Sequence, residues 1–125
     1  MTQEEKQLLL RDLCARLPYE LIVLEKAHKY GPLVDEDYRL DCFASDEISV
    51  TEFIMQQAEY IKPYLRPMSS MTPDERFEYD ELNHFYTKGL TFNVDEIDWL
   101  IAHHFDYRGL IPMGLALEAP EGMYK

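Results

Sequence analysis

The chain has 125 residues, of which 24 are acidic and 12 are basic, so its formal charge is −12. This charge repels phosphate groups and anionic lipids, and we expect no non-specific nucleic-acid binding and no binding to a membrane surface. Hydrophobic residues make up 46% of the chain, which is enough for a folded core, and the length fits a single domain over residues 1–125. The start of the chain does not have the pattern of a signal peptide, and no apolar run approaches the roughly 20 residues of a membrane helix. We therefore expect a cytoplasmic protein.

Four segments begin with a capping residue that is followed three positions later by Glu, which is the pattern of a helix capping box. The four pairs are Thr2–Glu5, Ser49–Glu52, Thr72–Glu75 and Asn93–Glu96. Apolar side chains recur at helical spacing after each pair. The sequence therefore predicts four helices, over about residues 3–16, 50–61, 73–86 and 94–105.

The segment between the first two predicted helices has the character of β-structure. Residues 19–25 contain the apolar run Leu21 to Leu24, and residues 38–43 alternate apolar and polar side chains. The two segments could pair as a hairpin. A lone hairpin is marginal in water, so it needs helices or a third strand to pack against.

Residues 110–117 are a candidate for the third strand, with a short helix as the alternative. Residues 62–71 contain Pro63, Pro67 and a pair of serines, so we expect a connector without regular structure there. The predicted fold class is therefore α+β, with about four helices and a small two- or three-stranded antiparallel sheet.

The acidic and histidine clusters lack the spacing of metal sites. A calcium loop that starts at Asp35 has Leu40 at its sixth position, where Gly is needed. His103 and His104 are adjacent, so on a helix they point about 100° apart and another segment, such as one with His84, would have to complete a site. We expect no metal ligands.

Motifs of catalysis and cofactor binding are also missing from the sequence. It contains no nucleophile motif and no Gly-rich phosphate loop. We therefore expect no catalytic residue and no cofactor, and the sequence argues against an enzyme. Cys14 and Cys42 lie in apolar surroundings and are expected to be buried free thiols.

Two sets of side chains are candidates for an interaction surface. Tyr and Arg are enriched at protein interfaces, and the candidates of this type are Tyr60, Tyr64, Arg66, Tyr79, Tyr86 and Tyr107. The alternative is that these tyrosines line the core with their hydroxyls in water. The candidates for an acidic surface are Asp74, Glu75, Glu78, Glu81, Asp95, Glu96 and Asp98. If they form one continuous face, they could imitate the phosphates of a nucleic acid.

Two stretches, IKPYLRPMSSMT at residues 61–72 and WLIAHHFDYRGLIPMGLALEAP at residues 99–120, are distinctive. Together with residues 1–18 they resemble a group of short proteins found in phages and mobile elements of gut anaerobic bacteria. The resemblance covers about half of the chain and transfers no activity and no residue role. It implies an accessory protein that acts in the cytoplasm of a bacterial host cell, with shared ends and a variable middle.

We therefore expect a protein-binding module with a regulatory or counter-defence role, whose partner is a host or phage protein or a second copy of the chain. One alternative is the acidic nucleic-acid mimic. The other is a binder of a small molecule or nucleotide signal, which needs Lys62, Arg66 and Arg108 to form a local basic cluster.

Overall fold

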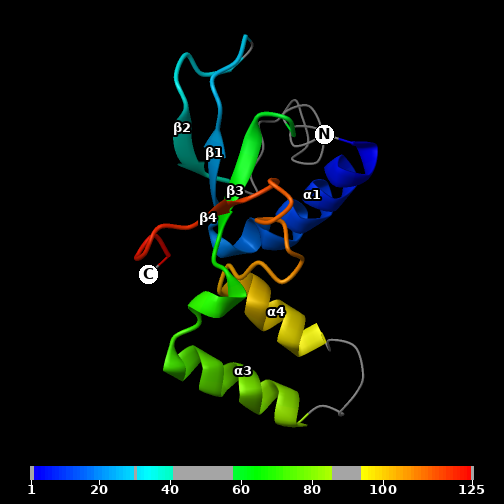
Figure 1. Ribbon diagram of the computed structural model, residues 1–125, viewed down its shortest axis with the longest axis vertical. Helices are drawn as coiled ribbons and strands as arrows, with labels where there is room; N and C mark the ends of the chain where they lie inside the picture. The colour runs from blue at the N-terminus through cyan, green and yellow to red at the C-terminus, as the bar shows by residue number, and fades with distance from the viewer. Residues whose placement is uncertain (1, 30, 41–57, 86–93, 125) are drawn as a thin grey trace.

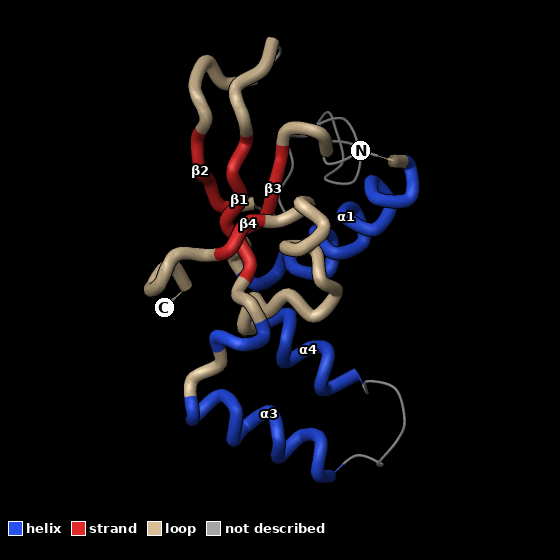
Figure 2. Tube along the Cα trace, viewed as in Figure 1, coloured by secondary structure: helices blue, strands red, loops and turns tan. Residues whose placement is uncertain are grey.

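The computed structural model describes residues 2–29, 31–40, 58–85 and 94–124, and these form an α+β fold (Figure 1). The α-helices described are α1 (Gln3–Arg16), α3 (Pro73–Phe85) and α4 (Val94–Ala102), the strands are β1 (Ile22–Glu25), β2 (Glu36–Arg39), β3 (Ile61–Leu65) and β4 (Leu117–Glu118), and two short 3-10 helices are η1 (Leu17–Tyr19) and η2 (Met68–Ser70). Helix α1 lies beside the sheet. Helices α3 and α4 lie side by side at the end of the molecule away from the loop that joins β1 and β2 (Figure 2).

The sheet has four strands in the order β2-β1-β3-β4. Strand β1 is antiparallel to both β2 and β3, and β3 is parallel to β4. The predicted α+β class is confirmed, but the sheet is mixed and larger than the expected antiparallel one. Of residues 110–117, the candidate third strand, only the last residue is in a strand, and turns fill much of the rest.

Strand β3 corrects the prediction made for residues 50–71. Residues 50–57 of the expected helix lie outside the described residues, residues 58–60 form a turn, and Ile61 begins the strand. Burial alternates along β3, with Ile61, Pro63 and Leu65 facing the core. The proline suggested a connector, yet its fixed φ suits an extended chain, and it removes only one backbone donor from the ladder.

Both predicted capping boxes that lie within the described residues are present. The Thr2 hydroxyl accepts from the Glu5 N–H at 3.0 Å, and the Glu5 carboxylate accepts from the Thr2 N–H at 2.8 Å. The same reciprocal pair joins Thr72 and Glu75, at 3.2 and 2.9 Å. The Ser49–Glu52 pair and Asn93 lie outside the described residues.

Helix α4 ends at Ala102, three residues before its predicted end. His104 has a left-handed backbone with φ of 66°. The N–H of Phe105 bonds to the carbonyl of Leu100 at 2.9 Å, and the N–H of His104 bonds to that of Ile101 at 3.0 Å. These two bonds form a Schellman motif, which terminates the helix, and His104 stands at the position where glycine is most common.

The core has two parts. The larger joins α1 to the sheet and to the loop after α4, and its fully buried members include Leu9, Leu13, Ile61 and Leu110. Cys14 is half-buried against it, and Cys42 lies outside the described residues. The smaller part lies between α3 and α4 and is built on Tyr79, Leu100 and Phe105.

Candidate functional site

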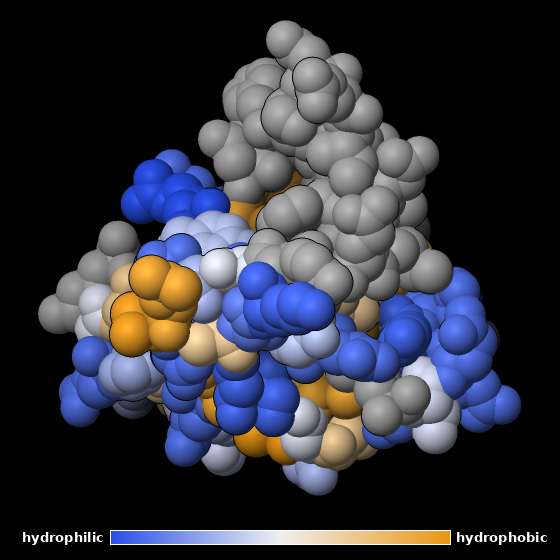
Figure 3. Space-filling view, turned by 90° about the horizontal axis from the view of Figure 1, so that it is seen from above, coloured by the Kyte–Doolittle hydropathy of each residue, from blue (hydrophilic) through white to orange (hydrophobic). Residues whose placement is uncertain are grey.

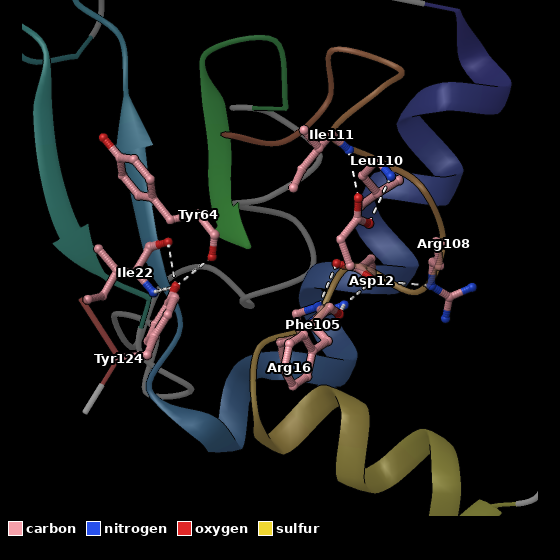
Figure 4. A network of polar contacts seen from close by, with 10 residues as sticks. Asp12, Arg16, Ile22, Tyr64, Phe105, Arg108, Leu110, Ile111 and Tyr124 are labelled. Atoms are coloured by element: carbon pink, nitrogen blue, oxygen red, sulfur yellow. Dashed lines mark hydrogen bonds and ion pairs between the residues drawn. The ribbon is translucent and has the colours of Figure 1, made fainter. Parts of the chain in front are cut away.

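An ion pair is buried on the core-facing side of α1 (Figure 4). The Asp12 carboxylate accepts from Nε and Nη2 of Arg16 at 2.8 and 3.2 Å, and from Nε of Arg108 at 3.1 Å. Nη2 of Arg16 also donates to the carbonyl oxygen of Phe105 at 2.7 Å. Because both members of the pair are fully buried, this network holds α1 to the loop that follows α4.

Two further anchors complete this network. The Asp106 carboxylate accepts from the backbone N–H groups of Leu110 and Ile111 at 2.8 and 2.9 Å. The Tyr124 hydroxyl donates to the Tyr64 carbonyl at 2.7 Å and accepts from the Ile22 N–H at 3.0 Å. It therefore bridges β1 and β3 where their own ladder ends (Figure 4). These groups are used within the fold, and we assign them a structural role.

Arg66, one of the predicted interaction residues, is engaged within the molecule. Its guanidinium forms two hydrogen bonds with the Glu75 carboxylate, at 2.5 and 2.7 Å, and lies 4.2 Å above the Phe105 ring. The hydrogen bonds from Arg66 lower the pKa of Glu75 to about 2. Nδ1 of His103 lies 3.6 Å from the same carboxylate. The arginine charge is thus neutralised locally.

Two cavities, of about 300 and about 810 Å³, flank the ion pair of Arg66 and Glu75. Both are lined by Arg66, Glu75 and Tyr124. At the smaller cavity the other arginine, Arg39, pairs with Glu20 at 3.4 Å. Since each of these arginines faces a carboxylate, the described residues that line the two cavities offer no uncompensated arginine to an anionic ligand.

A further cavity, lined by side chains of helices α3 and α4, has a different chemistry. It has about 340 Å³ and is lined by Phe77, Glu78, Glu81, Leu82 and Trp99. The Phe77 side chain is 67% exposed, although it is a large hydrophobic residue. The carboxylates of Glu78 and Glu81 are exposed beside it. We call this set of five residues the α3–α4 groove, an apolar slot with an acidic rim.

Trp99 is held in place as the wall of the α3–α4 groove. Its indole N–H donates to the Glu78 carboxylate at 3.1 Å. Its ring stacks on His103 with centroids 4.2 Å apart and packs near Tyr79 and Phe105 at 5.7 and 5.8 Å. A rigid aromatic wall beside an exposed phenylalanine is a suitable surface for an apolar side chain of another molecule.

The predicted acidic residues do not share one environment. Asp74, Glu81 and Asp98 are exposed, whereas Glu75 binds Arg66 and Glu78 binds Trp99. The prediction of Glu96 as a surface residue is wrong, because its side chain is buried and accepts from the Tyr79 hydroxyl at 2.6 Å. The side chain of Asp95 lies outside the described part. Part of the predicted acidic set is therefore engaged in helix capping and in contacts within the core.

The predicted aromatic residues are also dispersed. Tyr79 is buried in the smaller core, as in the alternative considered for the tyrosines. Tyr60 stacks on His28 at 3.9 Å, and the Tyr64 hydroxyl donates to Asp37 at 2.8 Å. Tyr107 is half-buried with Arg16 and Arg108 over its ring, at 5.8 and 4.9 Å, and Tyr86 lies outside the described residues.

Sequence reasoning missed the apolar members of the groove, Phe77, Leu82 and Trp99, as interaction residues. The available signal was Phe77, an aromatic residue among the charged residues of the third predicted helix, away from the stripe that contains Tyr79. An apolar residue on the polar face of an amphipathic helix is a reason to expect a contact surface.

In the parts of the chain that the structure describes, no three His, Cys, Asp or Glu side chains converge on a point that could hold a metal ion. Within the same four ranges, none of the helices combines the length and the apolar character needed to cross a bilayer. Arg66 and Arg108, which a nucleotide-signal binder would need in one basic cluster with Lys62, bind Glu75 and Asp12 instead. No protein-family model, curated protein or solved structure matches the chain.

Proposed function

We propose that the protein is a protein-binding module and that the α3–α4 groove receives an apolar segment of its partner. The observation that carries this proposal is the exposed Phe77 beside the fixed Trp99 ring in one apolar cavity. Tryptophan is among the residues that contribute most to protein interfaces, because its ring gives a large contact area with little rotational freedom. The resemblance to phage and mobile-element proteins supports a regulatory or counter-defence role in a bacterial cell.

The acidic rim of the groove favours a partner segment that has basic residues beside its apolar ones. Glu78 and Glu81 line the cavity, and the exposed Asp74 and Asp98 lie on the same two helices. The net charge of −12 adds a long-range field of the same sign. Lys or Arg side chains on the partner gain from both, whereas an acidic segment is repelled.

The two alternative functions have less support. A nucleic-acid mimic needs free carboxylates along one face, and Glu75 and Glu96 are committed to contacts within the fold. A binder of a nucleotide signal needs free cations, and Arg66 and Arg108 each have a carboxylate partner. The binding of an apolar segment in the α3–α4 groove requires neither free carboxylates nor free cations, because the walls of the groove are apolar.

The proposal is tested with three short synthetic peptides and the fluorescence of Trp99, which is the only tryptophan in the chain. The first peptide carries Leu and Val between Lys residues, the second replaces Leu and Val by Ser, and the third replaces Lys by Glu. We expect only the first to shift the Trp99 emission in a saturable way, because the groove needs apolar contact and opposite charge together.

Phe77→Ser is the test variant, and Met113→Ser is its matched control, because Met113 is another exposed hydrophobic residue outside the groove. We expect at least a tenfold loss of affinity for Phe77→Ser, which corresponds to about 1.4 kcal/mol, and no change for Met113→Ser. Equal binding of the first two peptides, or equal binding by both variants, contradicts the proposal.

A further inference from the structure

The walls of the α3–α4 groove are the sides of two helices. Phe77, Glu78, Glu81 and Leu82 belong to α3, and Trp99 belongs to α4. The two helices lie side by side and run in opposite directions (Figure 1). The other end of the molecule, around the loop between β1 and β2, shows mostly hydrophilic side chains among its described residues (Figure 3). The groove, in contrast, brings three apolar side chains together in one cavity.

The walls of the groove offer side chains to a partner, and their backbone donors are already used. In the interior of an α-helix each N–H bonds to the carbonyl four residues earlier, so the N–H groups of Phe77 to Leu82 are used within α3. The carbonyl of Trp99 accepts from the His103 N–H at 3.1 Å, and the Trp99 indole N–H donates to Glu78 at 3.1 Å. An extended segment therefore finds no strand edge in this groove to which it could pair.

The conformation of the bound segment follows from this property of the walls. An extended segment would turn N–H and C=O groups toward an apolar surface, where they have no partner. An unpartnered buried backbone group costs free energy comparable to a lost hydrogen bond. A helical segment avoids this cost, because its backbone groups bond to one another and only its side chains face the groove. The walls therefore favour a helix that packs its side-chain ridges against α3 and α4.

The acidic residues beside the groove form a row along α3. Asp74, Glu78 and Glu81 are four and three residues apart, so they lie within about 60° of one another around the helix and span about 10 Å along it. All three are exposed, and the Glu78 carboxylate can accept further donors besides the indole of Trp99. Arg76, the arginine of α3, projects at least about 140° away from each of them. A helix alongside α3 can present Lys or Arg at the same spacing.

We propose that the segment bound in the α3–α4 groove is an amphipathic α-helix of another protein, with apolar residues at helical spacing and Lys or Arg beside them. The inference rests on the proposed function, because it names the conformation and the sequence pattern of the partner of the same groove. The bound helix forms a three-helix unit with α3 and α4 and covers Phe77 and Trp99. The charge of −12 on each copy disfavours a second copy of the chain as the occupant.

The test compares three peptides that differ at one central position, on the side of the helix away from the groove. Each peptide has about 14 residues, with Leu at helical spacing, Lys beside the Leu residues and no Trp. The central position carries Ala, Gly or Pro. Gly weakens a helix and Pro breaks it, whereas an extended chain keeps the same Leu and Lys contacts in all three. Emission of Trp99, the only tryptophan of the chain, measures affinity, and circular dichroism measures helix formation.

We expect the Ala peptide to bind most tightly and to gain helix when the protein is added. The Gly peptide should bind several-fold more weakly than the Ala peptide, and the Pro peptide at least tenfold more weakly. Glu81→Gln tests the acidic row, and Glu118→Gln is its matched control, because Glu118 is an exposed carboxylate on β4 outside the groove. Affinity for the Ala peptide should fall about two- to fivefold in Glu81→Gln and stay unchanged in Glu118→Gln.

Four results overturn the inference. Equal affinities of the three peptides, or binding without a gain of helix, mean that the occupant is extended, and the proposed function then stands without the inference. Equal losses in Glu81→Gln and Glu118→Gln mean that the acidic row does not contact the helix. A wild-type mass that rises with concentration in sedimentation, while Phe77→Ser stays monomeric, means that a second copy fills the groove. If no peptide shifts the Trp99 emission, including the first peptide of the proposed function, both proposals are wrong.

Discussion

Acidification should destabilise the protein through His104, a histidine that the fold keeps neutral. Its ring is buried, stacks on Tyr124 with centroids 3.6 Å apart, and has no hydrogen-bond partner for Nδ1 among the described residues. Burial, together with the charges of Arg16 and Arg66, lowers its pKa from 6.5 to about 4. In the unfolded chain the same imidazole takes up a proton near pH 6.5.

The sign and the size of the effect follow from this difference. Between pH 6.5 and about 4 the unfolded state binds the proton and the folded state does not, so stability is complete above pH 6.5 and falls as the pH falls toward about 4. Each unit of pKa corresponds to about 1.4 kcal/mol, so the loss is on the order of 3 kcal/mol.

Urea unfolding at a series of pH values, followed by Trp99 fluorescence, measures this loss. His104→Asn removes the titration and keeps a residue that tolerates the left-handed φ of 66°. We expect the stability difference between wild type and variant to shrink by about 2–3 kcal/mol between neutral pH and pH near 4. His103→Asn, which changes the more exposed neighbour, should keep the wild-type slope. A difference that stays constant over this pH range refutes the reasoning.

Three further outcomes are expected from contacts within the fold. Asp12→Ala leaves the buried Arg16 without its carboxylate and should lower the free energy of unfolding in urea by about 3–5 kcal/mol. The double variant Asp12→Leu with Arg16→Met should lose much less, and a double variant that loses as much as Asp12→Ala or more contradicts this expectation. Glu75→Gln should reduce the loss of unfolding free energy that occurs as the pH falls from 4.5 to about 2. The lowered pKa of Glu75 means that its stabilising contribution is present above pH 4.5 and is lost as the pH approaches about 2. If the pH dependence of the variant equals that of the wild type, the ion pair with Arg66 does not have this role. Tyr124→Phe removes the hydroxyl bridge between β1 and β3. It should lower the free energy of unfolding by about 1 kcal/mol and speed proteolysis near the C-terminus, and an unchanged stability and cleavage rate contradict this expectation.

Features that depend on a few neighbouring residues could be predicted from the sequence. The capping boxes at Thr2 and Thr72 need only side chains three positions apart, and both form as expected. The early end of α4 is also a local event, but glycine usually marks it, and here His104 occupies the left-handed position. The sequence rule therefore placed the start of this helix and missed its end.

Features that depend on distant partners could not be predicted. Strand β3 forms because Ile61 and Pro63 pair with β1, nearly forty residues earlier in the chain, and this pairing outweighs the local signal of a proline. The α3–α4 groove needs Phe77 and Trp99 from two helices. The pairing has no signature within one segment, and of the groove only Phe77 is marked by its own helix.

Three separate stretches of the chain, residues 1–18, 61–72 and 99–120, contribute to one region of the fold. Arg16 of the first stretch donates to the carbonyl of Phe105 in the third, and Arg66 of the second lies over the Phe105 ring.

The sequence by itself determined the acidic charge, the α+β class and the starts of the three described α-helices, because these depend on composition and on contacts within one turn. Only the tertiary structure decided which charges are buried and which apolar residues are exposed. Asp12 and Arg16 lie inside because Phe105, 89 positions after Arg16, supplies a carbonyl acceptor there. Phe77 and Leu33 lie outside, because no neighbour within the described residues covers them. Burial is a property of the assembled fold, since a side chain leaves water only when a distant part of the chain replaces the water around it.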